Sequence, residues 1–357
     1  MRLFDTLAEM GHEQVVVCHD KASGYRGIIA IHDTTLGPAL GGARFWQYAS
    51  DEAALTDALR LSRGMTYKNA VAGLNLGGGK AVIIGDNRSP HREMLFRAHG
   101  RFVDSLGGRY ITAEDVGTTV EDMDFVHMET KHVTGIISRS GDPSSVTARG
   151  VFHAIRASAQ QRWGSDDLSG KRVAIQGCGN VGFHLAQELK RSGAVLIVAD
   201  IDPHKVARVV EATGATVVAS DDIYRQTADI FAPCALGGII NDSTLPELRV
   251  EIVAGAANNQ LLEDRHGDEL MQRGILYAPD YVANAGGVIN VYSELTGWDR
   301  QRCLRKADEI YHTVLSVFAL AARDGIPTYR AADRVAEQRI QAVRAMVRQW
   351  PQYPNSE

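Results

Sequence analysis

A glycine-rich segment in the middle of the chain constrains its fold more than any other stretch: Gly177-Cys178-Gly179-Asn180-Val181-Gly182. A predicted strand, 171–176, precedes it, and an amphipathic run, 183–192, follows it. The next apolar run, 194–199, leads to Asp200, eighteen residues after the last glycine. A GxGxxG segment is a weak signal by itself. In this order of strand, turn, helix, strand and acidic residue, it strongly predicts a βαβ unit that binds a dinucleotide.

The chemistry of each part of this unit supports that interpretation. The glycines permit a tight turn and a close approach of a pyrophosphate, while the helix that follows offers unpaired N–H groups and the positive end of its dipole. The Asp200 carboxylate is placed to accept hydrogen bonds from the adenine ribose and to repel a 2′-phosphate, which favours NAD over NADP. Asp202 adds a second negative charge, and no arginine follows at once. The alternative is a βαβ turn that binds no phosphate.

The surrounding segments extend this pattern into a fold class. After Pro143, predicted strands and helices alternate, which is typical of a doubly wound, mostly parallel sheet of the Rossmann type. A chain of 357 residues is too long for one hydrophobic core, so the N-terminal part is expected to form a second domain. Its short predicted strands, separated by helices and polar turns, indicate a mixed sheet. The sequence therefore predicts an α/β protein of two domains.

The composition excludes several classes of function. Basic and acidic residues are interspersed, the formal net charge is −5, and no run of lysine or arginine marks a surface for nucleic acid or anionic membrane. The apolar runs are too short to span a bilayer, and the N-terminus lacks the apolar core of a signal peptide. The four cysteines are scattered, and no histidine pair has metal-ligand spacing. We therefore expect a cytoplasmic protein with reduced thiols and no metal, nucleic-acid or membrane partner.

Two lysines in the N-terminal part are surrounded by glycine and apolar residues rather than by other charges. Lys68 lies near the end of a helix predicted from Asp51, and Lys80 follows Gly77-Gly78-Gly79 and leads into an apolar strand, 81–84. Two ammonium groups in a dry cleft repel each other, and desolvation adds to this effect, so the pKa of one should fall. That lysine can act as a base while its neighbour binds a carboxylate. The alternative is a flexible glycine turn between two surface lysines.

Other candidate positions depend on their place at the ends of predicted elements. Asp115 ends the short strand predicted at 110–115, which is a common position for a functional side chain, although on its own a cap of the next helix is the simpler interpretation. The segment 36–42 is predicted to be a loop whose glycines permit contact with a small ligand. Asn258 and Asn284 follow predicted strands of the C-terminal sheet, so they are candidate binding groups, although lone asparagines are ordinary turn residues.

Seven long segments carry a family resemblance in the right order along nearly the whole chain. They are HDTTLGPALGG (32–42), EAALTDALRLSRGMTYKNAVAGLNLGGGKAVI (52–83), GRYITAEDVGTT (108–119), IQGCGNVG (175–182), IFAPCALGG (230–238), AGAANNQ (254–260) and YAPDYVANAGGVINV (277–291). In these segments the chain resembles the amino-acid dehydrogenases of the glutamate/leucine/phenylalanine/valine family, and most closely its leucine dehydrogenase branch.

The resemblance implies a role for each candidate residue. Lys80 is the catalytic base, Asp115 handles proton transfer at the amino group, and Lys68 pairs with the substrate carboxylate. The other residues implied to contact the substrate are Leu40, Gly41, Gly42, Met65, Ala113, Asn258, Val288 and Val291. Those implied to contact NAD are Thr147, Gly177, Cys178, Gly179, Asn180, Val181, Gly182, Asp200, Ala235, Asn258 and Asn284.

The resemblance also implies an organisation and a reaction. Residues 1–135 and 326–357 would form a catalytic and oligomerisation domain, residues 136–325 the NAD-binding domain, and several chains a homo-oligomer, an octamer rather than a dimer. The reaction is the NAD-dependent, reversible oxidative deamination of an L-amino acid to its 2-oxo acid and ammonia.

The expected substrate is a branched aliphatic amino acid: leucine, valine or isoleucine. The pocket positions Leu40, Ala113, Val288 and Val291 are all apolar, so a glutamate side chain would place an unpaired carboxylate there. Gly79 and the short segment 135–143 depart from the leucine pattern and leave phenylalanine or tryptophan open, because an apolar pocket discriminates only modestly between apolar groups. A third hypothesis is a non-catalytic NAD-binding sensor, against which the complete set of Lys68, Lys80 and Asp115 argues.

Overall fold

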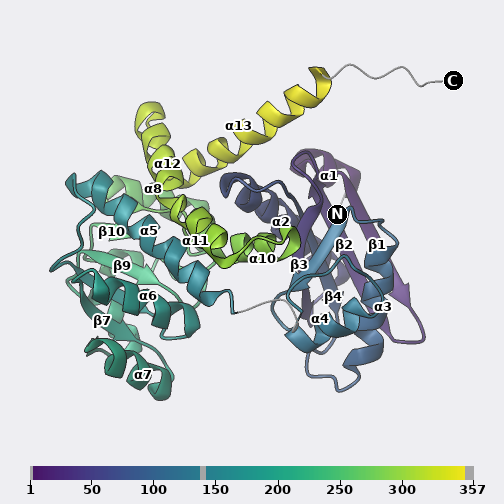
Figure 1. Cartoon of the computed structure of the whole chain (residues 1–357), viewed down its shortest axis with the longest axis horizontal. Helices are drawn as coiled ribbons and strands as arrows, with labels where there is room; N and C mark the ends of the chain where they lie inside the picture. The colour runs from purple at the N-terminus through teal and green to yellow at the C-terminus, as the bar shows by residue number, and fades with distance from the viewer. Residues whose placement is uncertain (1–2, 137–141, 350–357) are drawn as a thin grey trace. The chain divides into compact units, whose positions relative to one another are not determined.

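A computed structural model describes residues 3–136 and 142–349, and it divides the chain into two compact units (Figure 1). Unit 1 comprises Met1–Gly141 and Ala336–Glu357, and unit 2 comprises Asp142–Val335. The sequence placed these boundaries after residues 135 and 325. The second boundary differs because it falls inside one continuous helix, α13 (Thr328–Gln349), where no break in the sequence pattern marks the change of unit.

Unit 1 contains a mixed sheet of five strands in the order β1-β2-β4-β3-β5. The β1, β2 and β4 pairings are antiparallel, whereas β3 runs parallel to both β4 and β5. The mixed sheet predicted for the N-terminal part is therefore confirmed. The strands are β1 (Gln14–Asp20), β2 (Tyr25–Asp33), β3 (Ala39–Trp46), β4 (Gly77–Ile84) and β5 (Tyr110–Glu114).

The two faces of this sheet have different coverings. On one face, α3 (Arg92–Asp104) and α4 (Val120–His127) pack a core that includes Phe45, Phe96 and Tyr110, all nearly or fully buried. On the other face, α1 (Leu3–Met10) and α2 (Asp51–Val71) cover a second apolar cluster, to which β2 and β4 contribute buried residues but β3 and β5 do not. Buried Leu40 of β3 also lies on this second face, but outside that cluster.

Two segments expected to be loops or turns belong to strands. Residues 39–42, predicted as part of a loop, open β3, and Gly77-Gly78-Gly79 open β4. Their glycines are explained by close backbone packing, since a Cβ on Gly41 would lie 1.8 Å from the Gly79 carbonyl oxygen. A Cβ on Gly77 would lie 2.0 Å from the Asp33 carbonyl oxygen. The glycines are thus features of a tightly packed sheet rather than signals of flexibility.

Unit 2 has a six-stranded, fully parallel sheet in the order β11-β10-β9-β6-β7-β8. This order and the intervening helices confirm the predicted doubly wound, Rossmann-type fold. The strands are β6 (Arg172–Gln176), β7 (Val195–Ala199), β8 (Thr216–Val217), β9 (Ile230–Pro233), β10 (Ile252–Val253) and β11 (Leu276–Tyr277).

The helices of unit 2 correct two details of the sequence interpretation. The single helix expected at 300–323 is broken at Glu309, and the expected turn at 284–287 lies where one helix ends and the next begins. The helices are α5 (Ser144–Trp163), α6 (Asn180–Arg191), α7 (Pro203–Thr213), α8 (Asp264–Gln272), α9 (Asp280–Ala283), α10 (Gly286–Thr296), α11 (Arg300–Asp308) and α12 (Ile310–Asp324), with 3-10 turns η1 (Ser220–Arg225) and η2 (Leu245–Glu247).

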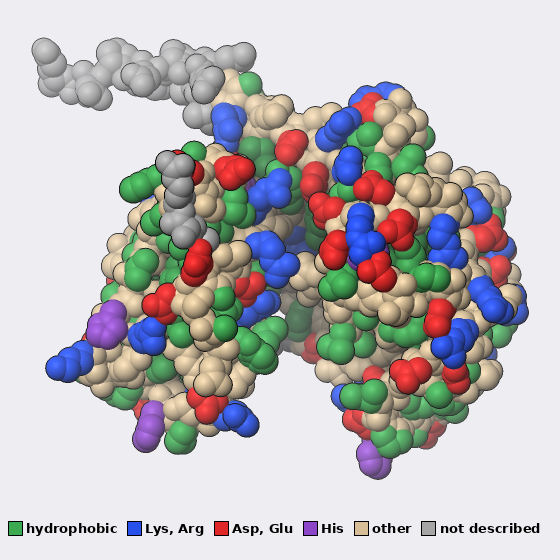
Figure 2. All heavy atoms as spheres, turned by 180° about the vertical axis from the view of Figure 1, so that it is seen from behind, with side chains coloured by type: hydrophobic (Ala, Val, Ile, Leu, Met, Phe, Trp, Pro, Cys, Tyr) green, Lys and Arg blue, Asp and Glu red, His purple; other side chains and the backbone are tan. Residues whose placement is uncertain are grey.

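The surface matches the mixed charge of the sequence. Acidic and basic side chains are interspersed over the face drawn in Figure 2. Within residues 3–136 and 142–349, no helix is both long enough and apolar enough to cross a membrane.

The core on the α3 side supports the strands that carry the candidate site, and its contribution can be measured. We expect Phe96→Ala to lower the free energy of unfolding by about 3–5 kcal/mol, because it opens a cavity in a fully buried position. Met94→Ala on the same helix removes a side chain that is 54% exposed, so it should change this free energy by less than about 0.5 kcal/mol. Urea denaturation at one protein concentration measures both, and equal effects would contradict the core assignment.

Candidate active site

Lys80 lies in the middle of β4 with only 4% of its surface exposed. Strand alternation places it, with Val82, on the face that α2 covers. Its ammonium nitrogen Nζ lies 3.0 Å from Oδ2 of Asp115, the residue that directly follows β5. The structure therefore brings together the two residues for which the sequence predicted catalysis, and it places Asp115 at the end of a strand as expected.

Burial sets the protonation of this pair. Desolvation lowers the pKa of Lys80; the Asp115 carboxylate acts against this shift, and the nearby Arg44 guanidinium adds to it. For Asp115, burial favours the neutral form, but Lys80 and Arg44 outweigh it and leave the pKa of this carboxyl below its usual range. Asp115 is thus held as a carboxylate, while Lys80 releases its proton more readily than an exposed lysine. The sequence predicted Lys68 as the second cation, and the Arg44 guanidinium is a cation of the same effect that the sequence did not indicate.

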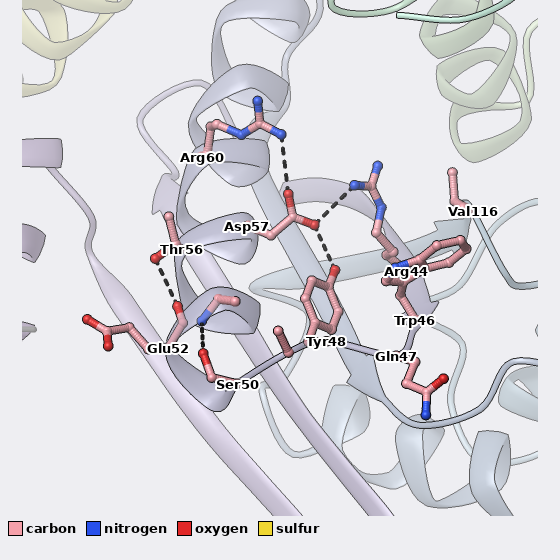
Figure 3. Close-up of a pocket in the computed structure, with 12 residues that line it drawn as sticks. Arg44, Trp46, Gln47, Tyr48, Ser50, Glu52, Thr56, Asp57, Arg60 and Val116 are labelled. Atoms are coloured by element: carbon pink, nitrogen blue, oxygen red, sulfur yellow. Dashed lines mark hydrogen bonds and ion pairs between the residues drawn. The ribbon is translucent and has the colours of Figure 1, made fainter.

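Arg44 was missed by the sequence analysis. It lies on β3, where its Nε donates a hydrogen bond to Asp115 Oδ2 at 2.9 Å and its Nη1 donates to Asp57 Oδ2 at 3.0 Å. The Tyr48 hydroxyl donates to the same Asp57 oxygen at 2.7 Å. These side chains line one wall of a cavity of about 870 Å³ in unit 1, which Trp46 and the start of α2 also line (Figure 3). Because the segment 36–42 was predicted to be a loop, no strand was expected that would place Arg44 beside β4.

The substrate-side residues predicted in unit 1 lie on the same strands and helix. Leu40 and Gly42 of β3 pair with Ile111 and Ala113 of β5, so Leu40 and Ala113 belong to adjoining strands. A Cβ on Gly42 would lie 2.8 Å from Asp115 Cβ, which shows how closely β3 passes the carboxylate.

On the α2 side, Met65 Cγ lies 3.3 Å from the position that a Cβ on Gly41 would take. Lys68 follows three residues later and therefore shares that helix face. Half-buried Lys68 thus belongs to the face of α2 that packs towards β3.

The glycine segment of unit 2 forms a turn with space above it. Gly177 adopts a φ of +102°, and Gly182 is required because a Cβ there would lie 2.0 Å from the Gly177 carbonyl oxygen. No atom lies within 4 Å of the position that a Cβ on Gly179 would take. Helix α6 begins at Asn180 without a side-chain cap, so its first N–H groups are available to a ligand.

Asp200 is fixed at the end of β7 by backbone donors. Its Oδ2 accepts a hydrogen bond from the Cys178 N–H at 2.7 Å, and its Oδ1 accepts one from the Asp202 N–H at 2.9 Å. Each carboxylate oxygen retains a further acceptor position for a ribose hydroxyl. Asp202 caps the start of α7, where it accepts from the His204 N–H, so it has a structural role besides its charge.

A second group of predicted cofactor residues gathers where α9 meets α10. Asn284 Nδ2 donates hydrogen bonds to Asn258 Oδ1 at 2.8 Å and to the Ala256 carbonyl oxygen at 3.0 Å. Its Oδ1 is buried and has no hydrogen-bond partner among the described residues. Thr147 Oγ1 lies 3.2 Å from the position of a Cβ on Gly287, which brings α5 against the start of α10.

The remaining predicted residues of unit 2 border these two groups. Ala235 packs on the glycine turn, since a Cβ on Gly177 would lie 2.9 Å from Ala235 Cβ. Val288 is buried in α10 and Val291 is partly buried three residues later on the same helix, so the two share one helix face. The segment 137–141, part of the short stretch that left the aromatic alternative open, lies outside the described residues.

A positive charge near the glycine turn was also missed. Arg208 of α7 lies with its guanidinium carbon 4.0 Å from the centre of the Phe183 ring, and its Nη2 is 3.5 Å from Asn180 Oδ1. Arg208 was not predicted because it does not directly follow Asp200 in the sequence. It reaches the glycine turn from α7, beside Asn180 and Phe183.

One side-chain group in the described parts of the chain has the geometry of a metal site but holds a guanidinium. Asp242, His266 and Glu269 place their ligand atoms within 4.8 Å of one another. Arg265 forms ion pairs with Asp242 at 2.7 Å and with Glu269 at 3.2 Å. The local charge is therefore already neutralised by a side chain.

Comparisons with known proteins match nearly the whole length of the chain. The model of the Glu/Leu/Phe/Val dehydrogenase dimerisation domain matches residues 12–132, and that of the glutamate/leucine/phenylalanine/valine dehydrogenases matches residues 140–349. Leucine dehydrogenase of Geobacillus stearothermophilus is 59% identical over 96% of this chain and 95% of its own. Valine dehydrogenase of Streptomyces coelicolor is 52% identical over 94% and 93%. The crystal structure of L-tryptophan dehydrogenase from Nostoc punctiforme superposes with a TM-score of 0.87 and 49% identity, covering 96% of this chain and 99% of that one.

The glycines beside Lys80 provide a test of how the site is built. We expect Gly78→Ala to lower the free energy of unfolding by about 1–3 kcal/mol, because its Cβ would lie 2.1 Å from the Thr66 backbone nitrogen and separate α2 from β4. Gly64→Ala, on the open side of α2, should instead raise this free energy by about 0.5–1 kcal/mol, because alanine favours the helix. Urea denaturation distinguishes the two, and stabilisation by Gly78→Ala would show that α2 does not pack on this strand.

Proposed function

The chain belongs to the glutamate/leucine/phenylalanine/valine dehydrogenase family, and from that premise we propose that it catalyses the NAD-dependent, reversible oxidative deamination of a branched aliphatic L-amino acid to its 2-oxo acid and ammonia. The family expected from the sequence is thereby confirmed. The observation that carries the proposal is the buried Lys80 held 3.0 Å from the Asp115 carboxylate, because this reaction needs a base and a proton carrier side by side.

Each side chain has a step in the proposed mechanism. Bound NAD supplies a hydride acceptor for the hydrogen on the substrate Cα. Lys68 holds the substrate carboxylate, which fixes the position of Cα. Lys80 in its neutral form removes a proton from the water that attacks the resulting iminium, and its lowered pKa favours that form. The Asp115 carboxylate, next to Lys80, takes up a proton transiently and passes it to the amino group, which leaves as ammonia while the hydroxyl added from water loses its proton and becomes the carbonyl of the oxo acid.

The residues of unit 2 fit a dinucleotide. The open space above Gly179, the uncapped start of α6 and the fixed Asp200 carboxylate suit a pyrophosphate and an adenine ribose. The buried Asn284 Oδ1 offers an acceptor to the amide of the nicotinamide. Asp200 favours NAD over NADP by charge repulsion of a 2′-phosphate.

The proposed substrate is leucine, valine or isoleucine. Leu40 and Ala113 give unit 1 an apolar surface near Asp115, and the leucine and valine dehydrogenases among the relatives support an aliphatic side chain. The aromatic alternative is supported by the match to a tryptophan dehydrogenase. A non-catalytic sensor is disfavoured because a buried lysine–aspartate pair is costly to desolvate and binding of NAD alone does not require it.

We also propose the organisation that the resemblance implied. Unit 1 would carry catalysis and oligomerisation, unit 2 would bind NAD, and the match to a dimerisation-domain model supports a homo-oligomer, for which we retain the octamer. The free cysteines of the described chain favour a reducing compartment such as the cytoplasm.

The proposed function predicts the outcome of a substrate panel. With NADH, ammonium and a series of 2-oxo acids, the purified protein should consume NADH with the branched aliphatic oxo acids at a kcat/KM about tenfold or more above that with aromatic ones. It should be nearly inactive with 2-oxoglutarate, whose second carboxylate would lack a partner. Absorbance at the NADH band reports the rate, and NADPH in place of NADH tests the cofactor preference.

Variants of two lysines complete this test. Lys80→Ala should retain NADH binding but lose about 10²–10⁴-fold in kcat, since the base is gone. Lys21→Ala, on the surface, should keep the activity of the unaltered protein. NADH binding with no consumption for any oxo acid would favour the sensor, and a fully active Lys80→Ala variant would overturn the assignment of the base.

The cofactor site predicts a separation of binding from stability. Gly179→Ala should change the free energy of unfolding by less than about 1 kcal/mol, because the added methyl enters open space. It should weaken NADH binding about tenfold or more, because the methyl lies where the pyrophosphate passes. Gly64→Ala is the control that should leave binding unchanged, and fluorescence titration measures both. Unaltered NADH binding by Gly179→Ala would place the dinucleotide elsewhere.

A further inference from the structure

A network of charged and polar side chains is hydrogen-bonded to Asp115 of the catalytic pair and has no part in the mechanism above. It consists of Arg44 on β3, Asp57 on α2 and Tyr48 in the segment between them. The network extends from Asp115, which binds Arg44, to the wall of the cavity described above, where Figure 3 shows Arg44, Asp57 and Tyr48 pointing towards one another. Arg44 and Asp57 are largely buried, with 22% and 15% of their side chains exposed. Buried charges that are fully paired in this way are costly to assemble, so their arrangement calls for an explanation.

Arg44 has the geometry of a bridge. Its Nε reaches Asp115 Oδ2 at 2.9 Å and its Nη1 reaches Asp57 Oδ2 at 3.0 Å, so two different nitrogen atoms bind two different carboxylates. Its position is fixed at the backbone, because Arg44 pairs with Val82 in the parallel β3–β4 register, two residues beyond Lys80. The planar guanidinium therefore presents its Nε to Asp115 in an orientation that the sheet fixes.

Asp115 needs such support because it lies outside the regular strand. It begins a turn in which the Thr118 N–H donates to the Asp115 carbonyl oxygen, and the Thr118 hydroxyl binds the Asp115 backbone. These contacts fix the main chain of Asp115 but leave the rotation of its side chain free. Lys80 and Arg44 are the side chains that bind its Oδ2. A lysine that gives up its proton during turnover loses charge at that moment, whereas an arginine remains charged.

We propose that Arg44 is a positioning residue, which holds the Asp115 carboxylate against Lys80 throughout the reaction cycle, and that Asp57, anchored by Tyr48, holds Arg44 in the position to do so. This inference rests on the proposed dehydrogenase function and deepens it. Arg44 acts through Asp115 and is not itself a base or an acid.

Arg44 and Asp57 act on the pKa of Lys80 in opposite directions. The titratable or charged groups of the described residues around Lys80 and Asp115 include Arg44 on β3, Asp57 and Lys68 on α2, Tyr48 before that helix, and Tyr110 and Glu114 on β5. Arg44 lowers the pKa of Lys80, and Asp57 raises it. Tyr48 remains neutral, because burial and the Asp57 carboxylate raise the pKa of its hydroxyl. Burial raises the pKa of Glu114.

Three variants test these signs through the dependence of kcat on pH. Neutral Lys80 is the active form, so activity falls as the pH drops through its pKa. Arg44→Gln removes a cation and should move this acidic limb to higher pH. Asp57→Asn removes an anion and should move it to lower pH. Arg44→Lys keeps the charge but loses the two-point bridge, so it should leave the limb in place and lower kcat about tenfold or more through misplacement of Asp115.

Arg60→Gln is the matched control. Arg60 also approaches Asp57, at 3.4 Å, but its side chain is 63% exposed and it binds Oδ1 of Asp57, whereas Arg44 binds Oδ2. This variant should keep both the kcat and the pH profile of the unaltered protein, because solvent screens an exposed charge. Urea denaturation of every variant verifies that the fold is intact, and the Asp57→Asn and Arg60→Gln pair decides the matter if Arg44→Gln does not fold.

The outcomes separate this inference from the proposed function. The positioning role would be supported if the acidic limb of kcat moved in opposite directions in Arg44→Gln and Asp57→Asn and stayed in place in Arg60→Gln. It also requires that Arg44→Lys lower kcat without moving the limb. Variants that lose activity equally without any shift, or an Arg44→Gln variant with the kcat and profile of the unaltered protein, would overturn it. An unaltered protein that consumes no NADH with any oxo acid and ammonium would instead refute the proposed function, whatever the variants show.

Discussion

The desolvation of one ammonium group is the constraint on which the rest of unit 1 depends. Lys80 is buried inside a strand, and an isolated charge there would be too costly to keep. The Asp115 carboxylate offsets part of that cost, while burial and, after it, the Arg44 guanidinium lower the pKa of Lys80. The sheet must therefore bring three strands together at one point, with β3, which carries Arg44, between β4, which carries Lys80, and β5, which Asp115 follows. The glycines at 77–79 permit this approach, because each would collide with neighbouring atoms if it carried a Cβ.

The two faces of the sheet in unit 1 differ: one packs the core that supports the strands, and the other carries the candidate site. The face towards α3 and α4 is filled by large apolar side chains such as Phe45 and Phe96, which gives the strands a fixed support. On the opposite face an apolar cluster lies beneath α1 and α2, while β3 carries both the apolar Leu40 and the charged Arg44. Because side chains alternate along a strand, every second residue of β3 and β4 faces the site while its neighbours belong to the core. A shift of register by one residue would bury the wrong set, so the core fixes the positions of Lys80 and Arg44.

The sequence predicted the parts of this protein that depend on local patterns. The turn at 177–182, its flanking strands and the place of Asp115 after β5 follow from periodicity and turn chemistry, and all are found. The network of Arg44, Asp57 and Tyr48 was not foreseen, because it depends on the parallel register of β3 and β4, which no local pattern specifies. The same is true of Arg208, which reaches the turn through the packing of α7. The strand β3 was missed because glycines that serve close packing have the same sequence signal as glycines of a loop.

The position that raised doubt about the substrate acts from the far side of the sheet. Gly79 is the neighbour of Lys80, so a side chain at position 79 would point away from the site, and its Cβ would lie 2.6 Å from the Tyr110 ring. Tyr110 is fully buried, and its hydroxyl donates a hydrogen bond of 2.6 Å to the Gly41 carbonyl oxygen. A methyl group at 79 would displace this ring and, through it, the segment of β3 that carries Leu40. If the substrate binds along Leu40 as proposed, residue 79 would act on that surface by shifting β3 rather than by touching the substrate.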